Sequence, residues 1–171
     1  MADASPLSPD VLQALAGSKV ILAPTDAGQE DNFVYTREAA ARLAAALNAE
    51  LVLYDRSAAT WGDTPHQEQA CDAARAEELG HDELVEQFAA MERLGAHQVR
   101  AYLASMPTWD GVENALRDTG ADVIVTPTEL DHPKFTDRFT IPGGDLVGRL
   151  RSYEGPVKIV VAEPDGSVAV V

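Results

Sequence analysis

The chain has 171 residues, which fits a single domain that buries about two-thirds of its surface on folding. With 13 basic and 28 acidic residues its formal net charge is −15, a field that disfavours binding to nucleic acid or to an anionic membrane surface. It contains no apolar run of roughly 18 residues and no signal-peptide pattern at its start, so we expect no membrane span and a cytoplasmic protein. The single cysteine, Cys71, has no intramolecular partner for a disulfide, as is usual in a reducing compartment.

The hydrophobic pattern after residue 17 alternates between strand-like and helix-like segments. Residues 1–17 are predicted to be an extension that ends in one helical turn, and residues 65–79 are polar enough for an exposed helix. Pro24 is expected to stop the first strand. The predicted strands are 19–23, 51–54, 99–103, 122–125 and 157–162, the predicted helices are 33–47, 84–95, 107–119 and 144–153, and 167–171 is expected to be a hairpin partner.

Five strands separated by helices predict one doubly wound α/β domain, with a five-stranded, mostly parallel sheet and helices on both faces. We place this domain at residues 18–163, followed by a turn and short strand at 164–171. In such sheets ligands bind at the carboxyl ends of the strands, where the strand order reverses. The candidate ligand-binding segments are therefore 24–31, 55–57, 105–109 and 126–144.

The first strand ends in an acidic residue, in the sequence ILAPTD from Ile21 to Asp26. At a strand's carboxyl end, Asp26 is placed to accept hydrogen bonds from a ribose or an adenine, or to hold Mg²⁺ through water. The alternative is that Asp26 only braces the following turn. A second signal is Gly143-Gly144 before a predicted helix, which offers backbone N–H groups to an anion or is an ordinary helix cap.

Several weaker patterns have both a functional and a structural interpretation. Lys134 and Arg138 stand four residues apart, as do two phenylalanines beside them. A helix here would be either a lid over an anionic ligand or a surface segment whose rings pack on the core. Trp61 and Trp109 are candidates for an aromatic wall, although packing is the commoner role. His66 and Cys71 lack the further ligands of a metal site, and the G-x-S-x-G, Walker and G-x-G-x-x-G motifs are missing.

Three short motifs, in order and at the right spacing, resemble the universal stress protein family, which has an adenine nucleotide alpha-hydrolase-like α/β fold. They are ILAPTD at 21–26, GADVIV at 120–125 and GPVKIVV at 155–161, and the resemblance covers roughly residues 18–163. The resemblance implies a usually dimeric protein, some of whose relatives hold ATP. It implies that Asp26 contacts the base or sugar, that Asp55-Arg56 borders the adenine, and that a glycine loop after Thr126 wraps the phosphates.

That loop departs from the family pattern. Pro127 and Leu130 stand in place of its first two glycines, Gly143 takes the place of the later glycine, and Gly144 takes that of a hydroxyl residue. Pro127 removes a backbone donor, and Glu129 and Asp131 would repel phosphates. The altered loop therefore weakens the expectation of conventional ATP binding.

We therefore weigh three functions. The first is a non-enzymatic stress-response or regulatory protein that binds an adenine nucleotide or a related anion, such as ATP with Mg²⁺. The second is a nucleotide-free dimeric interaction module, and the third is a weak ATPase, which ranks last because no general base is evident.

An unpaired edge at the final strand and the resemblance both predict a homodimer through that strand. The predicted nucleotide-binding residues are Pro24, Thr25, Asp26, Arg56, Thr126, Gly143, Gly144, Lys134 and Arg138.

Overall fold

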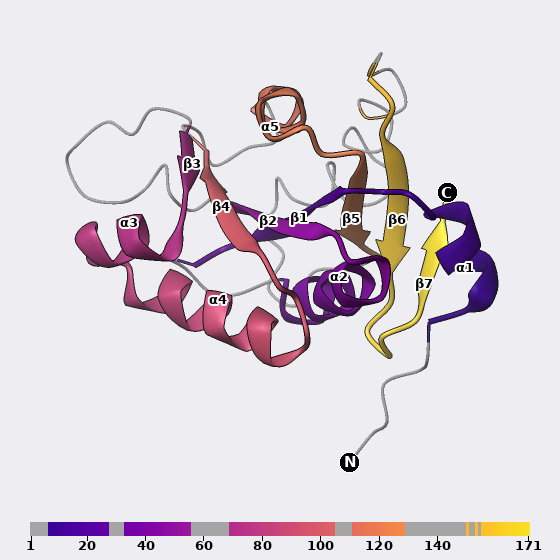
Figure 1. The fold of residues 1–171 in the computed structure, drawn as a ribbon, viewed down its shortest axis with the longest axis horizontal. Helices are drawn as coiled ribbons and strands as arrows, with labels where there is room; N and C mark the ends of the chain where they lie inside the picture. The colour runs from indigo at the N-terminus through magenta and orange to yellow at the C-terminus, as the bar shows by residue number, and fades with distance from the viewer. Residues whose placement is uncertain are drawn as a thin grey trace.

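The computed structural model describes residues 7–27, 33–55, 69–104, 111–128, 150, 153 and 155–171. Within them one seven-stranded sheet has the order β3-β4-β2-β1-β5-β6-β7 (Figure 1). The five inner strands are parallel, and the two edge strands are antiparallel to their neighbours. The predicted five-stranded α/β fold is confirmed, with one further strand at each edge. The strands are β1 (Val20–Thr25), β2 (Glu50–Asp55), β3 (Gln69–Cys71), β4 (Val99–Leu103), β5 (Val123–Pro127), β6 (Lys158–Ala162) and β7 (Val168–Val170).

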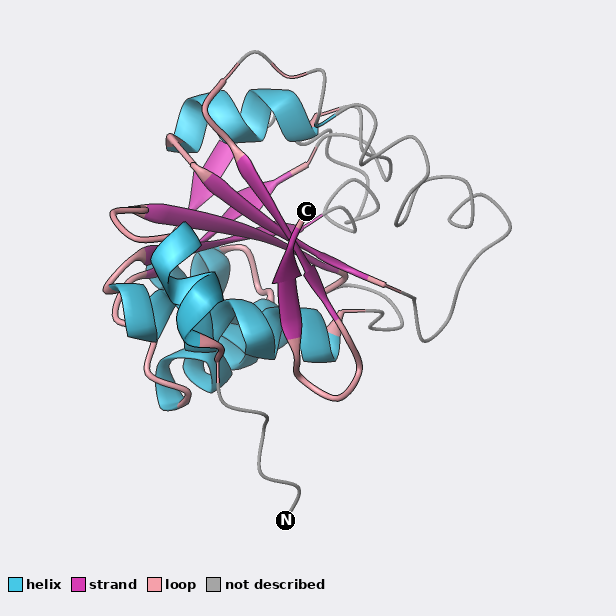
Figure 2. Ribbon diagram, turned by 90° about the vertical axis from the view of Figure 1, so that its right-hand side faces the viewer, coloured by secondary structure: helices cyan, strands magenta, loops and turns pink. Residues whose placement is uncertain are grey.

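Helices cover both faces of this sheet, as expected for a doubly wound fold (Figure 2). Strand residues alternate between two apolar cores: Leu51 and Leu53 belong to one, and Val52 and Tyr54 to the other. The first core lies under α1, α2, α3 and α4, and the second lies under α5. The helices are α1 (Pro9–Ala14), α2 (Val34–Leu47), α3 (Ala73–Glu78), α4 (Asp82–Arg93) and α5 (Val112–Thr119). No helix among these is long and apolar enough to cross a membrane.

The strand order reverses between β1 and β5. From β1 the chain proceeds outward through β2 to β4, and it then returns to the other side of β1 with β5 and continues to β6. The β1–β2 register runs from Val20↔Glu50 to Thr25↔Asp55. The β1–β5 register covers Ile21↔Val123 and Leu22↔Ile124. The carboxyl halves of β1 and β5 thus flank the position where such folds bind ligands.

The expectation that Pro24 stops the first strand is wrong, because β1 continues through Pro24 to Thr25. The carbonyl of Lys19 accepts from the N–H of Glu50 beside β2, and the carbonyl of Val20 accepts from the N–H of Asp122 beside β5. Backbone groups of successive strand residues point to opposite neighbours, so even-numbered residues of β1 face β5. Proline at position 24 therefore removes a donor toward β5 and leaves the ladder to β2 intact.

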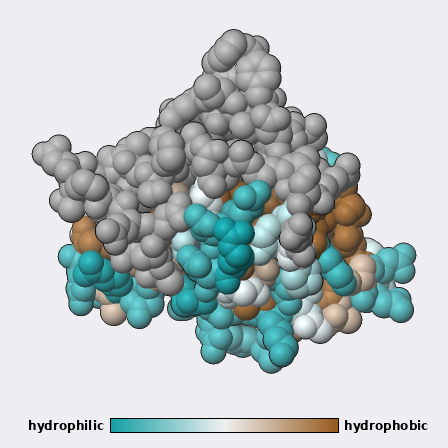
Figure 3. Space-filling model, turned by 90° about the horizontal axis from the view of Figure 1, so that it is seen from above, coloured by the Kyte–Doolittle hydropathy of each residue, from teal (hydrophilic) through white to brown (hydrophobic). Residues whose placement is uncertain are grey.

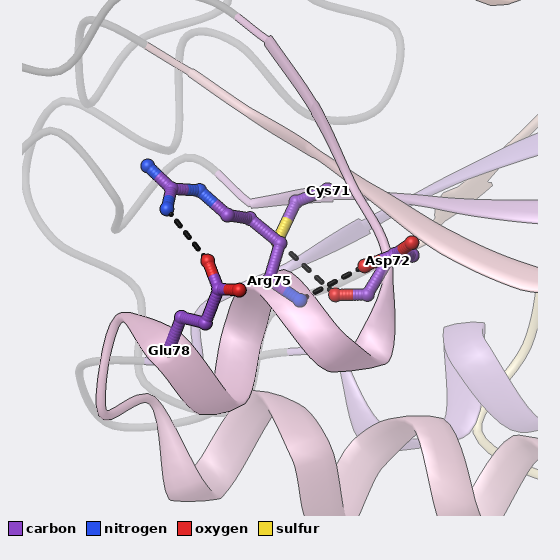
Figure 4. Close-up of polar contacts among 4 residues, drawn as sticks. All are labelled: Cys71, Asp72, Arg75 and Glu78. Atoms are coloured by element: carbon purple, nitrogen blue, oxygen red, sulfur yellow. Dashed lines mark hydrogen bonds and ion pairs between the residues drawn. The ribbon is translucent and has the colours of Figure 1, made fainter.

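The predicted exposed helix at 65–79 is also partly wrong. Gln69–Cys71 forms β3, antiparallel to β4, and only Ala73–Glu78 is helical, while residues 65–68 lie outside the described part. Asp72 sets this boundary, because its side chain caps α3 by accepting from the N–H of Arg75 at 2.8 Å (Figure 4). The open edge of β4 outweighs the weak strand propensity of these three residues.

The two ends of the chain both join the domain. Residues 168–170 pair antiparallel with β6, which confirms the predicted hairpin. The strand at 158–162 is therefore an inner strand, and the expectation of an open edge there is wrong, because β7 of the same chain covers it. Leu15, just after α1, is fully buried in the core beneath α2. Of the predicted helix at 144–153, all but Leu150 and Tyr153 lie outside the described residues.

Candidate functional site at the carboxyl ends of the strands

Buried polar side chains gather where β1, β2 and β5 end. The side chains of Asp26 and Arg37 are 2% and 6% exposed, which is rare for charged groups. A charged side chain that is buried on folding needs a hydrogen-bond or ion-pair partner. Asp26 and Arg37 therefore indicate a polar region within an otherwise apolar core. The buried polar side chains of the described residues are Thr25, Asp26, Thr36, Arg37, Asp55 and Thr126.

Thr25 links three elements below this end of the sheet. Its hydroxyl donates to Oε1 of Gln87 in α4 at 2.6 Å and accepts from Nη1 of Arg37 in α2 at 3.2 Å. The hydroxyl is thus engaged with the helices that cover one face. Thr25 therefore fixes the carboxyl end of β1, and Asp26 follows it directly.

Asp55 fixes the next segment of chain. Oδ1 of Asp55, at the end of β2, accepts from the backbone N–H of Ala27 at 3.4 Å. This contact bridges from the end of β2 to the turn that follows β1. Asp26 lies between the two anchored residues Thr25 and Ala27, so its backbone is held from both sides.

Thr126 differs from Thr25 and shares with Thr36 a buried hydroxyl that has no hydrogen-bond partner within the described residues. It lies at the carboxyl end of β5, is fully buried, and its Oγ1 has no hydrogen-bond partner within the described part of the chain. The paired part of β1 and β5 ends at Leu22↔Ile124, and Thr126 follows two residues later on β5. A buried hydroxyl without a partner costs free energy, and a bound water, ion or ligand is one of the explanations for such a group in a native structure.

The two residues after Thr126 offer no backbone donor to a ligand. Pro127 has no N–H, and the N–H of Thr128 donates to the carbonyl of Ala162 in β6 at 3.0 Å. In a phosphate-binding loop, successive N–H groups after the strand point at the anion. The first two residues after Thr126 therefore present no such row of backbone N–H groups to an anion.

The structure brings four of the nine predicted binding residues together at this edge: Pro24, Thr25, Asp26 and Thr126. The other five, Arg56, Lys134, Arg138, Gly143 and Gly144, lie outside the described residues, and their roles stay predictions.

The sequence reading missed Arg37 and Gln87. Arg37 follows Phe33 by four residues and precedes Ala40 by three, so it stands on the apolar stripe of its helix, and this charge in the stripe was the available signal.

Two features lie outside this edge. A cavity of about 420 Å³ at the opposite ends of β2 and β4 includes none of the predicted site residues. It is lined by Glu50, Asp72, Ala73, Ala74, Glu92, His97, Gln98, Val99 and Arg100.

Cys71 is buried, and burial, followed by the charge of Asp72, raises its thiol pKa to about 11. Among the described residues no group of three or more His, Cys, Asp or Glu side chains is placed to hold a metal ion.

Comparisons with known proteins test the fold. No family model matches the sequence, and no curated protein matches it. Among solved structures, the chain superposes on a universal stress protein in complex with cAMP with a TM-score of 0.53 and 14% identity, covering 85% of this chain and 97% of that one. The fold resembles that of a universal stress protein.

Two deacetylases match less closely. One belongs to the teicoplanin biosynthetic pathway (TM-score 0.46, 15% identity, 85% of this chain and 64% of that one). The other is the N,N'-diacetylchitobiose deacetylase from Pyrococcus horikoshii (TM-score 0.44, 12% identity, 84% and 60%).

Proposed function

We propose that this protein binds an adenine nucleotide at the carboxyl ends of β1 and β5 and acts as a non-enzymatic, cytoplasmic regulatory protein of the universal stress protein family. The observation that carries the proposal is the buried hydroxyl of Thr126. It has no partner within the described part of the chain and lies near the end of β5, at the reversal of strand order. Asp26, at the neighbouring strand end, adds a carboxyl group that can accept from a ribose or a base.

Two further points support this function. The similar universal stress protein was solved with cAMP, which is an adenine nucleotide. Pro24 has no N–H with which β1 could donate a backbone hydrogen bond to β5. This missing bond allows the two strands to stay apart where the ligand would enter.

The test is to identify what the protein carries. The protein is purified without added nucleotide and denatured, and the released small molecules are identified by chromatography and mass spectrometry. An equimolar adenine nucleotide supports the proposal. If the protein is empty, titration with adenosine and with ATP plus Mg²⁺ decides, because a ligand that binds the native state raises its melting temperature.

A variant locates the site. Asp26→Ala is expected to weaken binding at least tenfold, or about 1.4 kcal/mol, whereas the exposed Asp82→Ala should leave affinity unchanged. Equal affinity of the Asp26 variant and the wild type would move the site elsewhere.

The alternative function is a nucleotide-free interaction module that works as a homodimer. Pro127 and the bonded N–H of Thr128 favour it, because both reduce the capacity of this edge for phosphate. The surface that would pair is the edge strand β7, on which Val170 is 38% exposed, together with Val171 just after it, which is 54% exposed. Figure 3 shows hydrophobic surface on the right-hand side, the side on which β7 and the C-terminus lie in Figure 1. Absence of any shift in melting temperature with adenosine or ATP would favour this alternative.

A further inference from the structure

The cavity at the amino ends of β2 and β4 has the size of a small-molecule site. Its volume is about 420 Å³, and every residue that lines it belongs to the described part of the chain. Its walls come from the first residues of β2 and β4, the start of α3, the last turn of α4 and the connection from α4 to β4. Figure 4 shows one lining residue, Asp72, where β3 passes into α3. Because most of the lining residues are exposed, a small molecule can enter from solvent.

The charged groups of this cavity favour a cation. Three of its lining residues, Glu50, Asp72 and Glu92, carry carboxyl groups. The guanidinium group of Arg100 donates through Nε to Oε1 of Glu50 in a partly buried ion pair, so these two charges offset each other. The carboxyl groups of Asp72 and Glu92 then leave the lining with an excess of two negative charges when His97 is neutral.

The helices beside the cavity keep this negative character. Helix α4 ends at the cavity, and the C-terminal end of a helix carries a partial negative charge that favours a cation. Arg93, in the same turn of α4, is not among the lining residues. Arg75 of α3 does not line the cavity either, and it forms an ion pair with Glu78 at 2.9 Å (Figure 4).

The lining suits an organic cation better than a metal ion. Among the described residues no three His, Cys, Asp or Glu side chains are placed to hold one metal ion, so the carboxyl groups do not converge on one point. Ala73, Ala74 and Val99 contribute apolar surface, which methylene groups can cover and a metal ion cannot. A chain with an ammonium group at each end matches both features.

We propose that this cavity binds a small aliphatic diamine. Its two ammonium groups contact the carboxyl groups of Asp72 and Glu92, and its methylene chain lies on the two alanines at the start of α3. The cavity is at the opposite end of the sheet from the nucleotide site of the proposed function, and the proposal does not depend on that function.

The experiment is a calorimetric titration of the full-length protein with putrescine, a four-carbon diamine, at low and at high salt. Putrescine should bind at low salt and more weakly at high salt, because salt screens exposed charges. The diol of the same chain length has hydroxyl groups in place of the ammonium groups and should not bind. Equal affinity for the diamine and the diol, or no binding of putrescine at millimolar concentration, overturns the proposal.

Two double variants with the same change in charge locate the site. Asp72→Asn with Glu92→Gln should weaken putrescine binding about tenfold, and α3 keeps its cap because asparagine caps a helix about as well as aspartate does. Glu83→Gln with Glu86→Gln removes two charges from exposed positions in the first half of α4, and affinity should fall by less than about twofold. An equal loss in both double variants would show that putrescine responds only to the net charge of −15, and the proposed site would then be wrong.

A third variant separates this site from the nucleotide site. Asp26→Ala, at the carboxyl end of β1, should leave the affinity for putrescine unchanged. If it weakens putrescine binding as much as the Asp72 and Glu92 double variant does, the diamine binds at the other end of the sheet and the proposal is overturned.

Discussion

Arg37 and Thr25 connect helix α2 to the end of the central strand. Nη1 of the arginine donates to Oγ1 of the threonine over 3.2 Å, and both side chains are buried. The same hydroxyl donates to Gln87 at 2.6 Å, so α2, β1 and α4 meet at one oxygen atom. Asp26 follows Thr25 directly, and this arrangement therefore connects the packing of two helices to the position of the candidate ligand-binding carboxyl group.

Replacing Arg37 should destabilise the fold. Arg37→Met removes a charged donor from the buried hydroxyl of Thr25, and a hydrogen bond to a charged group contributes about 1.5–3 kcal/mol. The matched control is Arg42→Met in the same helix, whose partner Glu38 lies 3.7 Å away on the surface. The control should cost at most about 1 kcal/mol. Urea denaturation measures both, and equal losses in the two variants would contradict this role for Arg37.

Two buried threonines should respond in opposite ways to the same substitution. Thr25→Val removes both hydrogen bonds of the hydroxyl and leaves Gln87 and Arg37 with one contact fewer, at a cost of about 1–3 kcal/mol. Thr126→Val removes a hydroxyl that has no partner within the described part, so stability should be unchanged or raised by up to about 1 kcal/mol.

The free energies of unfolding of these two variants test whether Thr126 is a functional group retained at a cost in stability. A loss for Thr126→Val as large as that for Thr25→Val would show that its hydroxyl has a structural partner.

Cys71 should make the stability of the protein sensitive to alkaline pH. Burial raises its thiol pKa from 9.0 to about 11, so the folded state keeps the proton that the unfolded state loses above pH 9. Its contribution is complete below pH 9 and is lost as the pH rises to about 11.

The measurement for Cys71 is the free energy of unfolding of wild type and Cys71→Ala from pH 8 to pH 11. The wild type should lose more stability than the variant over this range, and parallel curves would contradict the assignment. At neutral pH the native thiol should react slowly with maleimides.

Edge strand β7 should control self-association. Val170 is 38% exposed on this strand, and lysine on an edge strand discourages pairing with a second chain. If the protein is a homodimer through β7, Val170→Lys should raise the dissociation constant at least tenfold. Val34→Lys, at a 42% exposed position on α2, should not. Sedimentation of the three proteins at micromolar concentration measures this, and a monomeric wild type would rule out the dimer.

Much of the fold follows from local patterns. Apolar runs such as 51–54 and 159–160 are buried on both faces of the sheet because helices cover both faces, and this composition predicted inner parallel strands. Asp26 could be placed at a strand end because it directly follows such a run. The turn signal Pro164-Asp165-Gly166 likewise predicted the hairpin between β6 and β7.

Other features depend on contacts between distant parts of the chain. Pro24 was expected to end its strand because proline lacks an N–H, yet only the register shows that this missing donor faces β5 and not β2. Residues 69–71 became a strand because β4 offered an open edge. The engagement of Thr25 with Arg37 and Gln87 joins positions 12 and 62 residues away.

By itself, therefore, the sequence determined the class of fold, the positions of the inner strands and the acidic residue after the first of them. Short-range hydrophobic periodicity encodes these features. Only the tertiary structure decided which donors and acceptors at the strand ends are already paired and which, such as the hydroxyl of Thr126, have no partner within the described residues. Hydrogen bonds between segments distant in sequence determine which of these donors and acceptors are paired, and short-range sequence patterns do not predict such bonds.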